Sequence, residues 1–383
     1  GCNCPGCRAY FEAIEGAAPD LGEATSPDQL PATGFGGESS LLASSVGATA
    51  GTAGAIPSMI GDFFGNNYEY AFMNPDGTTV ATAGGARRFK YAENTNPFPT
   101  DRVFFNYHFF EDPLLDRSGH PRDLSTFTFG LEKTFCDDLF SVEFRIPFSA
   151  ALDSEQSLVD AQQMATEFGN MTLAAKVLLH QTDRTAVAAG LGMVFPTGND
   201  SVVSNGESTV IIFENSSVYL QPFIGIYNAP TDRLFHQFLA QVDFDASGSD
   251  VIIPAGSFLA QNETNQSQVS RLQSQSLLYL DYQVGYWLRR DPGARVLTGV
   301  APLVELHYTS TLQNLDLGEF GTERRGQSRG IFVEDLRRDV LNLTSGVYLE
   351  LFQHTSVKLA AVAPLLEDRV FDYELSLQLN HRF

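Results

Sequence analysis

From Arg102 to its end, the chain consists largely of segments in which apolar and polar residues alternate. The segments RVFFNYHFF, STFTFGLEKTF, FSVEFRIPF and NMTLAAKVLLHQ each place apolar side chains at every second position. Because successive side chains of a strand point to opposite faces, this period of two predicts strands with one apolar and one polar face. About twelve such segments follow one another, which predicts an all-β fold.

The links between these segments alternate in length. After the second, fourth, sixth, eighth and tenth segments they are short, namely CDD, TD, APTD, DPGA and QHT. Most of the others are long, as at 149–168, 196–216, 245–276 and 310–339, although the last link, near PLLEDR, is short. Short turns at one rim and long loops at the other are typical of outer-membrane barrels. This pattern predicts an antiparallel up-and-down β-barrel whose two ends meet at the short-turn, periplasmic rim.

A soluble β-sandwich or jelly roll shows the same period of two, so the period alone does not separate the two folds. The apolar faces span about five positions, close to the ~9–11 residues with which a tilted strand crosses a bilayer. Tyr and Phe gather near segment ends, as in the aromatic girdles of membrane barrels. The chain has no run of ~18 apolar residues, so no membrane-spanning helix is predicted. We therefore expect a transmembrane barrel of about 12 strands over 101–383, in the outer membrane of a diderm bacterium.

The first hundred residues differ from the barrel part. Residues 1–55 hold three cysteines and a run rich in Gly, Ala and Ser, with too few large apolar side chains for a core. Residues 56–100 contain a short apolar cluster and are expected to form a plug or a periplasmic segment. The formal net charge of −22 would repel DNA and RNA, so nucleic acid is not an expected partner.

If the apolar parity faces lipid, the other parity lines the interior. Because buried charges are costly without partners, a polar lumen is the natural place for them. The predicted lumen residues are Glu132, Glu143, Arg145, Lys176, His180, Asp243, Asp281, Glu305, His307, Glu350, Lys358, Asp372 and Glu374. Acids outnumber bases in this set, which predicts a lumen that favours cations. The alternative is that the charges only pair with one another and stabilise the interior.

Three stretches resemble known outer-membrane proteins. The final segment VFDYELSLQLNHRF ends on Phe383 and resembles the signal read by the outer-membrane assembly machinery. The resemblance implies that this machinery is a partner of the protein. GLGMVFPTG resembles the strand-then-PTG motif of phenol-degradation MetA-like channels, distant relatives of fatty-acid-transporter barrels. RRFKYAENTNPFPTDRVFFNYHFF resembles a segment of planctomycete outer-membrane proteins. The resemblance covers about 101–383 and implies a channel. In the final segment, Phe371, Tyr373 and the later odd residues are expected to face lipid.

The four cysteines allow several interpretations. Cys2, Cys4 and Cys7 lie in GCNCPGCR, and Cys136 lies in the second predicted periplasmic turn. Disulfides are favoured because the periplasm is oxidising, and a bond from the N-terminal cluster to Cys136 is allowed if both lie at one rim. A CxxC redox pair, a zinc site completed by Cys136 and a lipidated Cys2 remain alternatives.

The acidic stretch DFDASGSD offers a weak calcium candidate. Asp243, Asp245 and Asp250 have spacings like those of an EF-hand loop, but Pro254 stands where that loop needs a bidentate Glu. A solvated acidic loop is the simpler interpretation. We therefore predict no metal site and no cofactor.

No H-E-x-x-H, P-loop or G-x-S-x-G motif is present, and no catalytic residue is predicted. The leading hypothesis is a passive channel or diffusion transporter for small solutes, and not an enzyme. The alternative is a plugged structural or surface-interaction barrel, whose long loops bind partners or copies of itself in a homo-oligomer. A barrel enzyme is a weaker alternative.

Overall fold

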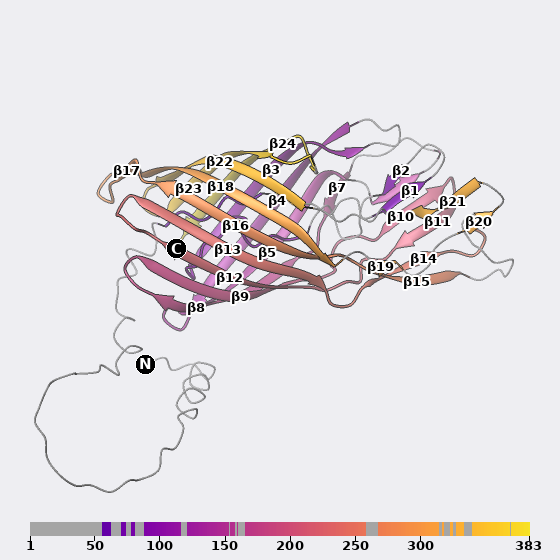
Figure 1. Ribbon diagram of the computed structural model, residues 1–383, viewed down its shortest axis with the longest axis horizontal. Coiled ribbons are helices and arrows are strands. Elements are labelled where there is room, and N and C mark those ends of the chain that lie inside the picture. Colours follow the sequence, from indigo (N-terminus) through magenta and orange to yellow (C-terminus); the bar gives the residue numbers. More distant parts are fainter. Residues whose placement is uncertain are drawn as a thin grey trace, which may run out of the picture.

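The strands of the chain form a closed barrel with an added sheet at one end (Figure 1). The computed structural model describes residues 56–62, 70–73, 78–80, 88–115, 121–152, 154–157, 159, 165–257, 267–313, 316–317, 322–324, 327–332, 339–367 and 369–383. Predictions about residues 1–55, including Cys2, Cys4 and Cys7, lie outside these ranges. Within the described ranges, no helix has the length and apolar character needed to cross a membrane.

The barrel is a closed 12-strand antiparallel sheet. Its strands are β3 (Arg102–Leu115), β4 (Pro121–Phe135), β5 (Phe140–Leu152), β8 (Thr172–Gln181), β9 (Thr185–Val194), β12 (Tyr219–Asn228), β13 (Leu234–Asp245), β16 (Ser276–Tyr286), β18 (Leu297–Gln313), β22 (Asp339–Leu351), β23 (Thr355–Pro364) and β24 (Tyr373–Arg382). Each strand pairs with its neighbour along the chain, and β24 pairs with β3 from Tyr373↔Glu111 to Arg382↔Arg102. The predicted fold class is confirmed.

Two short strands supplement the barrel wall. β7 (Ala165–Phe168) continues the line of β8 and pairs with the far half of β5. β17 (Arg289–Arg290) pairs with the start of β18 at the opposite, short-turn rim.

The outer face of the barrel is apolar and its inner face is polar. Phe129, Leu131, Val304, Leu359 and Leu375 are each more than two-fifths exposed. Between them along the same strands, buried side chains such as Thr128, Glu305 and Lys358 point inward. A water-soluble sheet would bury the apolar face, whereas this arrangement suits a barrel with hydrocarbon outside.

At the long-link end, apolar side chains of the wall and of the link before β24 form a layer in the interior. This apolar layer consists of Phe110, Leu124, Leu277, Tyr279, Val340, Val362, Val370 and Phe371. Phe371 was expected to face lipid together with Tyr373, but it is buried in this layer. The reason is that β24 begins only at Tyr373, so the strict alternation does not extend back to Phe371.

The long links fold into a second sheet beyond the barrel, at the right of Figure 1. Its order is β19 (Asp316–Leu317), β15 (Gln268–Gln273), β14 (Ser249–Ile253), β11 (Ser208–Phe213), β10 (Ser201–Asn205) and β6 (Glu155–Ser157). A further four-stranded sheet has the order β2 (Thr78–Val80), β1 (Tyr70–Met73), β21 (Gln327–Phe332) and β20 (Thr322–Arg324). It pairs a segment that precedes the barrel with the link between β18 and β22.

Candidate functional site

The lumen of the barrel holds two stretches of irregular backbone, 56–62 and 88–100, which we call the lumen segments. Met59, Ile60 and Asn94 are at most 1 % exposed. The two segments bond to each other, with Met59 N donating to Thr95 O at 2.7 Å. Irregular backbone needs hydrogen-bond partners when buried, and the inward side chains of the wall supply them.

Glu305 of β18 holds the turn of the first lumen segment. Its two carboxylate oxygens accept hydrogen bonds from the backbone N–H groups of Ile60 at 2.7 Å and Gly61 at 2.9 Å. Gly61 has a φ of +83°, and a Cβ there would lie 2.6 Å from Cα of Glu93. Glycine is therefore needed both for the backbone conformation and for the close approach of the second segment.

Lys358 of β23 bonds to both lumen segments. Its Nζ donates to Ser58 Oγ at 2.7 Å, Met59 O at 2.8 Å and Asn94 Oδ1 at 2.9 Å. From the next strand, Gln378 Nε2 donates to Ile60 O at 2.7 Å. These wall side chains bond largely to main-chain atoms, so they fix the position of the segments through backbone geometry as well as through side-chain packing.

A first ionic cluster joins Lys90 of the second lumen segment to the wall. Its Nζ contacts Asp62 and lies 2.7 Å from Asp281 Oδ1 of β16. His307 Nδ1 is 2.8 Å from the same Asp281 oxygen, and Asn342 Nδ2 donates to Asp62 at 2.7 Å. In the described part of the chain, Asp62, Asp281 and His307 are the group whose spacing could hold a metal ion. The ammonium of Lys90 already supplies positive charge there.

A second ionic cluster surrounds Arg102 at the start of β3. Its guanidinium lies 2.8 Å from Glu132 and 2.7 Å from Glu143, and Glu143 lies 2.5 Å from Arg145 Nε. Lys176 Nζ is 2.9 Å from Glu132. All five side chains are buried. Charges removed from water in this way are tolerated because each has partners of the opposite sign.

The lumen segments also supply charges to the outer half of the lumen. His108 lies between Glu93 at 3.0 Å and Glu374 at 2.5 Å. Arg88 Nε lies 3.2 Å from Asp243 Oδ2. The lumen segments therefore place an acid beside a base of the wall, and a base beside an acid of the wall.

The structure places most predicted lumen residues inside the barrel. The buried ones are Glu132, Glu143, Arg145, Lys176, Asp243, Asp281, Glu305, His307, Glu350, Lys358 and Glu374. His180 and Asp372 are exposed, which corrects their predicted placement. A bulge between Leu178 and His180 reverses the faces of β8, and Asp372 precedes β24, where it pairs with Arg369 at 3.2 Å.

Arg102, Arg88 and Lys90 are buried bases of the lumen that were not among the predicted lumen residues. Arg102 shares its parity with Asn106 and His108, so the alternation alone could have identified it. Arg88 and Lys90 lie in a stretch without strand structure, where no period assigns a face.

The weak calcium candidates have other partners. Asp243 is held by Arg88 and by Gln221 Nε2 at 3.0 Å. Asp245 accepts hydrogen bonds from Ser217 Oγ at 2.9 Å and Gly248 N at 2.7 Å, which makes it part of a turn. Asp250 lies on the separate strand β14.

The PTG motif fastens links at the long-loop end. Thr197 N and Gly198 N donate to Asn170 Oδ1 at 3.1 and 3.0 Å, and Met171 N donates to Thr197 Oγ1 at 2.8 Å. Asn215 Nδ2 donates to Gly198 O at 2.9 Å. The motif therefore connects the junction of β7 and β8 with the links that flank β10 and β11.

Phe383 lies at the short-turn rim beside the start of the barrel. Its N–H donates to Asp101 O at 3.3 Å, and Lys133 Nζ lies 5.4 Å from the centre of its ring. Asp101 in turn contacts Lys133 and accepts from Thr134 N at 2.6 Å. Cys136 lies close in sequence, in the turn between β4 and β5, with a φ of 57°.

An apolar exterior, a polar interior and closure of the sheet define a membrane-spanning β-barrel, here with an occupied lumen. No family model and no curated protein matches the sequence. Several solved structures are similar, among them an outer membrane channel from Pseudomonas putida F1, at 11% identity and a TM-score of 0.48, over 76% of this chain and 97% of that one. The beta domain of the Bordetella autotransporter BrkA is similar at 9% identity and a TM-score of 0.45, over 74% and 100%. The KdgM porin is similar at 8% identity and a TM-score of 0.39, over 73% and 99%.

Proposed function

We propose that this protein is an outer-membrane barrel transporter for small solutes in which the lumen segments form the gate. In the described state they occupy the lumen, and solutes pass when they move. The observation that carries the proposal is the nature of the contacts: Glu305, Lys358 and Gln378 hold main-chain atoms of the segments by hydrogen bonds. Water can replace such hydrogen-bond partners at a small net cost, so movement of the segments is opposed mainly by the apolar contacts of Met59, Ile60 and Phe89 with the wall.

The opened lumen should favour cations. When the segments leave, Arg88 and Lys90 leave together with Asp62 and Glu93, and the wall residues Asp243 and Asp281 lose the cations that lie 3.2 and 2.7 Å away. The negative charge of these wall carboxylates is then exposed to the pore and raises the local cation concentration. Solutes must also cross the apolar layer, which favours small ones.

A reversible lock of the gate tests this proposal. A Cβ built on Gly225 of β12 lies 3.8 Å from Cβ of Pro97, which is within the range of disulfide-bonded cysteines. We expect the variant with P97C and G225C to conduct less in planar bilayers when oxidised and to regain conductance on reduction. The control carries G225C alone, and both are made with the four native cysteines replaced by serine. Equal conductance of the locked and reduced forms would contradict gating by this segment.

A second candidate function is a permanently plugged barrel that binds partners at the cell surface. The six-stranded sheet β19-β15-β14-β11-β10-β6 favours it, because the long links build an ordered sheet rather than loose loops. In this case neither form of the locked variant would conduct, and removal of 249–273 would abolish cell-surface binding without affecting the barrel. Neither candidate requires a catalytic group.

The outer-membrane location is part of the proposal. Phe383 lies at the short-turn rim, where the assembly machinery would read it. We expect F383D to lower the amount of folded barrel in the outer membrane, while F383Y retains it, as measured by heat-modifiable migration. Normal levels of F383D would contradict this role.

We also propose that Cys136 forms a disulfide with the N-terminal cysteine cluster. Its position in the short-turn rim, together with the oxidising periplasm, supports the bond. Peptide mapping of the non-reduced protein should show a Cys136-linked peptide that disappears on reduction.

A further inference from the structure

A cavity of about 340 Å³ opens at the short-turn rim, on the side of the lumen segments away from the apolar layer. Its inner wall includes Phe98, Tyr227, Phe235 and Trp287. Its mouth is formed by turns between strands, including Arg184 and Asp232, whose side chains are 56% and 93% exposed. Solvent therefore reaches a chamber whose deeper wall is aromatic.

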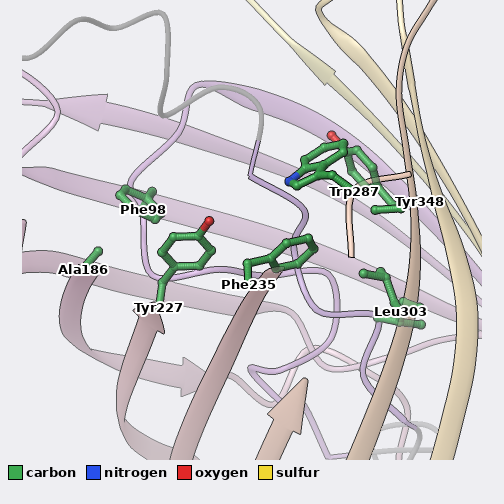
Figure 2. Close-up of a cluster of buried hydrophobic side chains, with 9 residues drawn as sticks. Phe98, Ala186, Tyr227, Phe235, Trp287, Leu303 and Tyr348 are labelled. Carbon is green, nitrogen blue, oxygen red and sulfur yellow. The ribbon is translucent and has the colours of Figure 1, made fainter. Parts of the chain in front are cut away.

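The aromatic wall is a continuous set of rings (Figure 2). The ring centres of Phe98 and Tyr227 are 5.5 Å apart, those of Tyr227 and Phe235 are 6.3 Å apart, and those of Phe235 and Trp287 are 5.9 Å apart. Rings at such spacings present faces and edges to a further ring. A cavity of roughly 150 Å³ suffices for benzene, so this one has room for a one- or two-ring molecule.

Two glycines make room for these rings. A Cβ on Gly285 would lie 2.1 Å from the ring of Phe235, and one on Gly299 would lie 2.6 Å from the ring of Trp287. A side chain at either position would clash with these rings in their present positions. The positions of the Phe235 and Trp287 rings therefore depend on glycine in the wall strands β16 and β18.

Charge at the cavity distinguishes one arginine from the other. Arg184 is 3.3 Å from Asp232 and donates to Pro230 O at 2.6 Å, so its guanidinium already has partners. The guanidinium of Arg290 lies 5.3 Å from the centre of the Trp287 ring. Among the residues that the structure describes, no carboxylate lies within ion-pair distance of Arg290. Its neighbour Arg289 is paired with Asp291 at 3.3 Å and does not line the cavity.

We propose that this cavity binds small aromatic carboxylates, with the ring against Tyr227 and Trp287 and the carboxylate on Arg290. A guanidinium stacked on an aromatic face is well placed to bind a planar anion through two parallel N–H donors. Ile56 and Phe98 of the lumen segments also line the cavity, so the ligand would contact the gate. This inference concerns binding and holds whether or not the barrel conducts.

The single tryptophan of the chain makes the test direct, because Trp287 lies in the cavity wall. The purified full chain is titrated with 4-nitrobenzoate, which quenches tryptophan emission, and free N-acetyltryptophanamide corrects for absorbed light and collisions. We expect saturable quenching, with 4-nitrobenzamide and 4-nitrobenzylamine binding at least about fivefold more weakly. R290Q should weaken binding of the carboxylate by about fivefold and leave the amide unchanged, whereas R289Q should alter neither.

The other outcomes would overturn the proposal. Quenching without saturation means that no site exists. Equal binding of the acid and the amide, or tighter binding of the amine, removes the role of Arg290 and points to the acidic side chains at the mouth. Equal effects of R289Q and R290Q would show general electrostatics rather than a site. Conductance is measured separately, so failure here leaves the gating proposal standing.

Discussion

Two layers inside the barrel are provided by different parts of the chain. The apolar layer at the long-loop end is made by the wall and the link before β24. In the middle, the ionic cluster around Lys90 and the pair of His108 with Glu93 depend on the lumen segments, which supply Asp62, Lys90 and Glu93. The first layer is therefore lost only with the sheet, whereas the second can be lost while the sheet persists. This difference assigns a barrel-stabilising role to one layer and a gating role to the other.

The largest expected effect is on the attachment of the lumen segments. K90M removes the cation between Asp62 and Asp281 and leaves two buried carboxylates without it. Breaking a buried ion pair in this way costs about 3–5 kcal/mol. We expect faster hydrogen exchange in 56–62 and 88–100 with little change in the barrel strands. Equal acceleration across the strands would show that the two layers form one cooperative unit.

The matched change in the apolar layer should have the opposite pattern. Leu124 is fully buried there, and L124A is expected to destabilise the barrel by about 2–5 kcal/mol through lost burial and a cavity. The temperature of heat-modifiable migration should fall, while hydrogen exchange in the lumen segments stays close to that of the unchanged protein at low temperature. Selective release of the segments by L124A would contradict the separation of the layers.

A smaller effect is expected at Glu305. E305Q keeps the shape of the side chain but removes the negative charge of the carboxylate that accepts hydrogen bonds from Ile60 N and Gly61 N. The charge-assisted bonds contribute about 1.5–3 kcal/mol, so their weakening should raise the fraction of time the gate is open. Single-channel recordings should show more frequent openings of unchanged size. The same substitution at the exposed Glu367 is the control.

The smallest effect concerns the rim beside Phe383. Burial raises the pKa of Asp101, but hydrogen bonds from Lys133 and Thr134 outweigh it and hold the pKa below its usual value. Because the folded-state pKa is depressed, its stabilising contribution is present above the unfolded-state pKa and is lost as the pH falls through the lower folded-state value. D101N should therefore lower the melting temperature slightly at pH 7. The difference from the unchanged protein should shrink as the pH falls below the usual Asp pKa of about 3.9 and through the lower folded-state value.

The alternation of apolar and polar residues predicted most of the barrel wall, but little of what lies in the lumen. Each barrel strand follows from a period of two that one apolar face imposes, and the pairing of β24 with β3 follows from closure. Lys358 and Glu305 were identified because their parity is fixed by their strands. His180 was misplaced because a bulge is one extra residue without a sequence signal of its own. Asp62 and Lys90 occupy irregular backbone, whose position depends on long-range contacts that no local pattern encodes.

The pairing of β24 with β3 has a consequence for the order of assembly. The lumen segments lie before β3 in the chain, yet wall strands on several sides bond to them, including β18, β23 and β24. A closed sheet has no edge through which they could enter sideways. The simplest route is that a strand made late on the ribosome closes the ring around a segment made early. Matching of Lys90 to Asp281 and of Arg102 to Glu132 would then precede closure and help to set the register in which the ring is sealed.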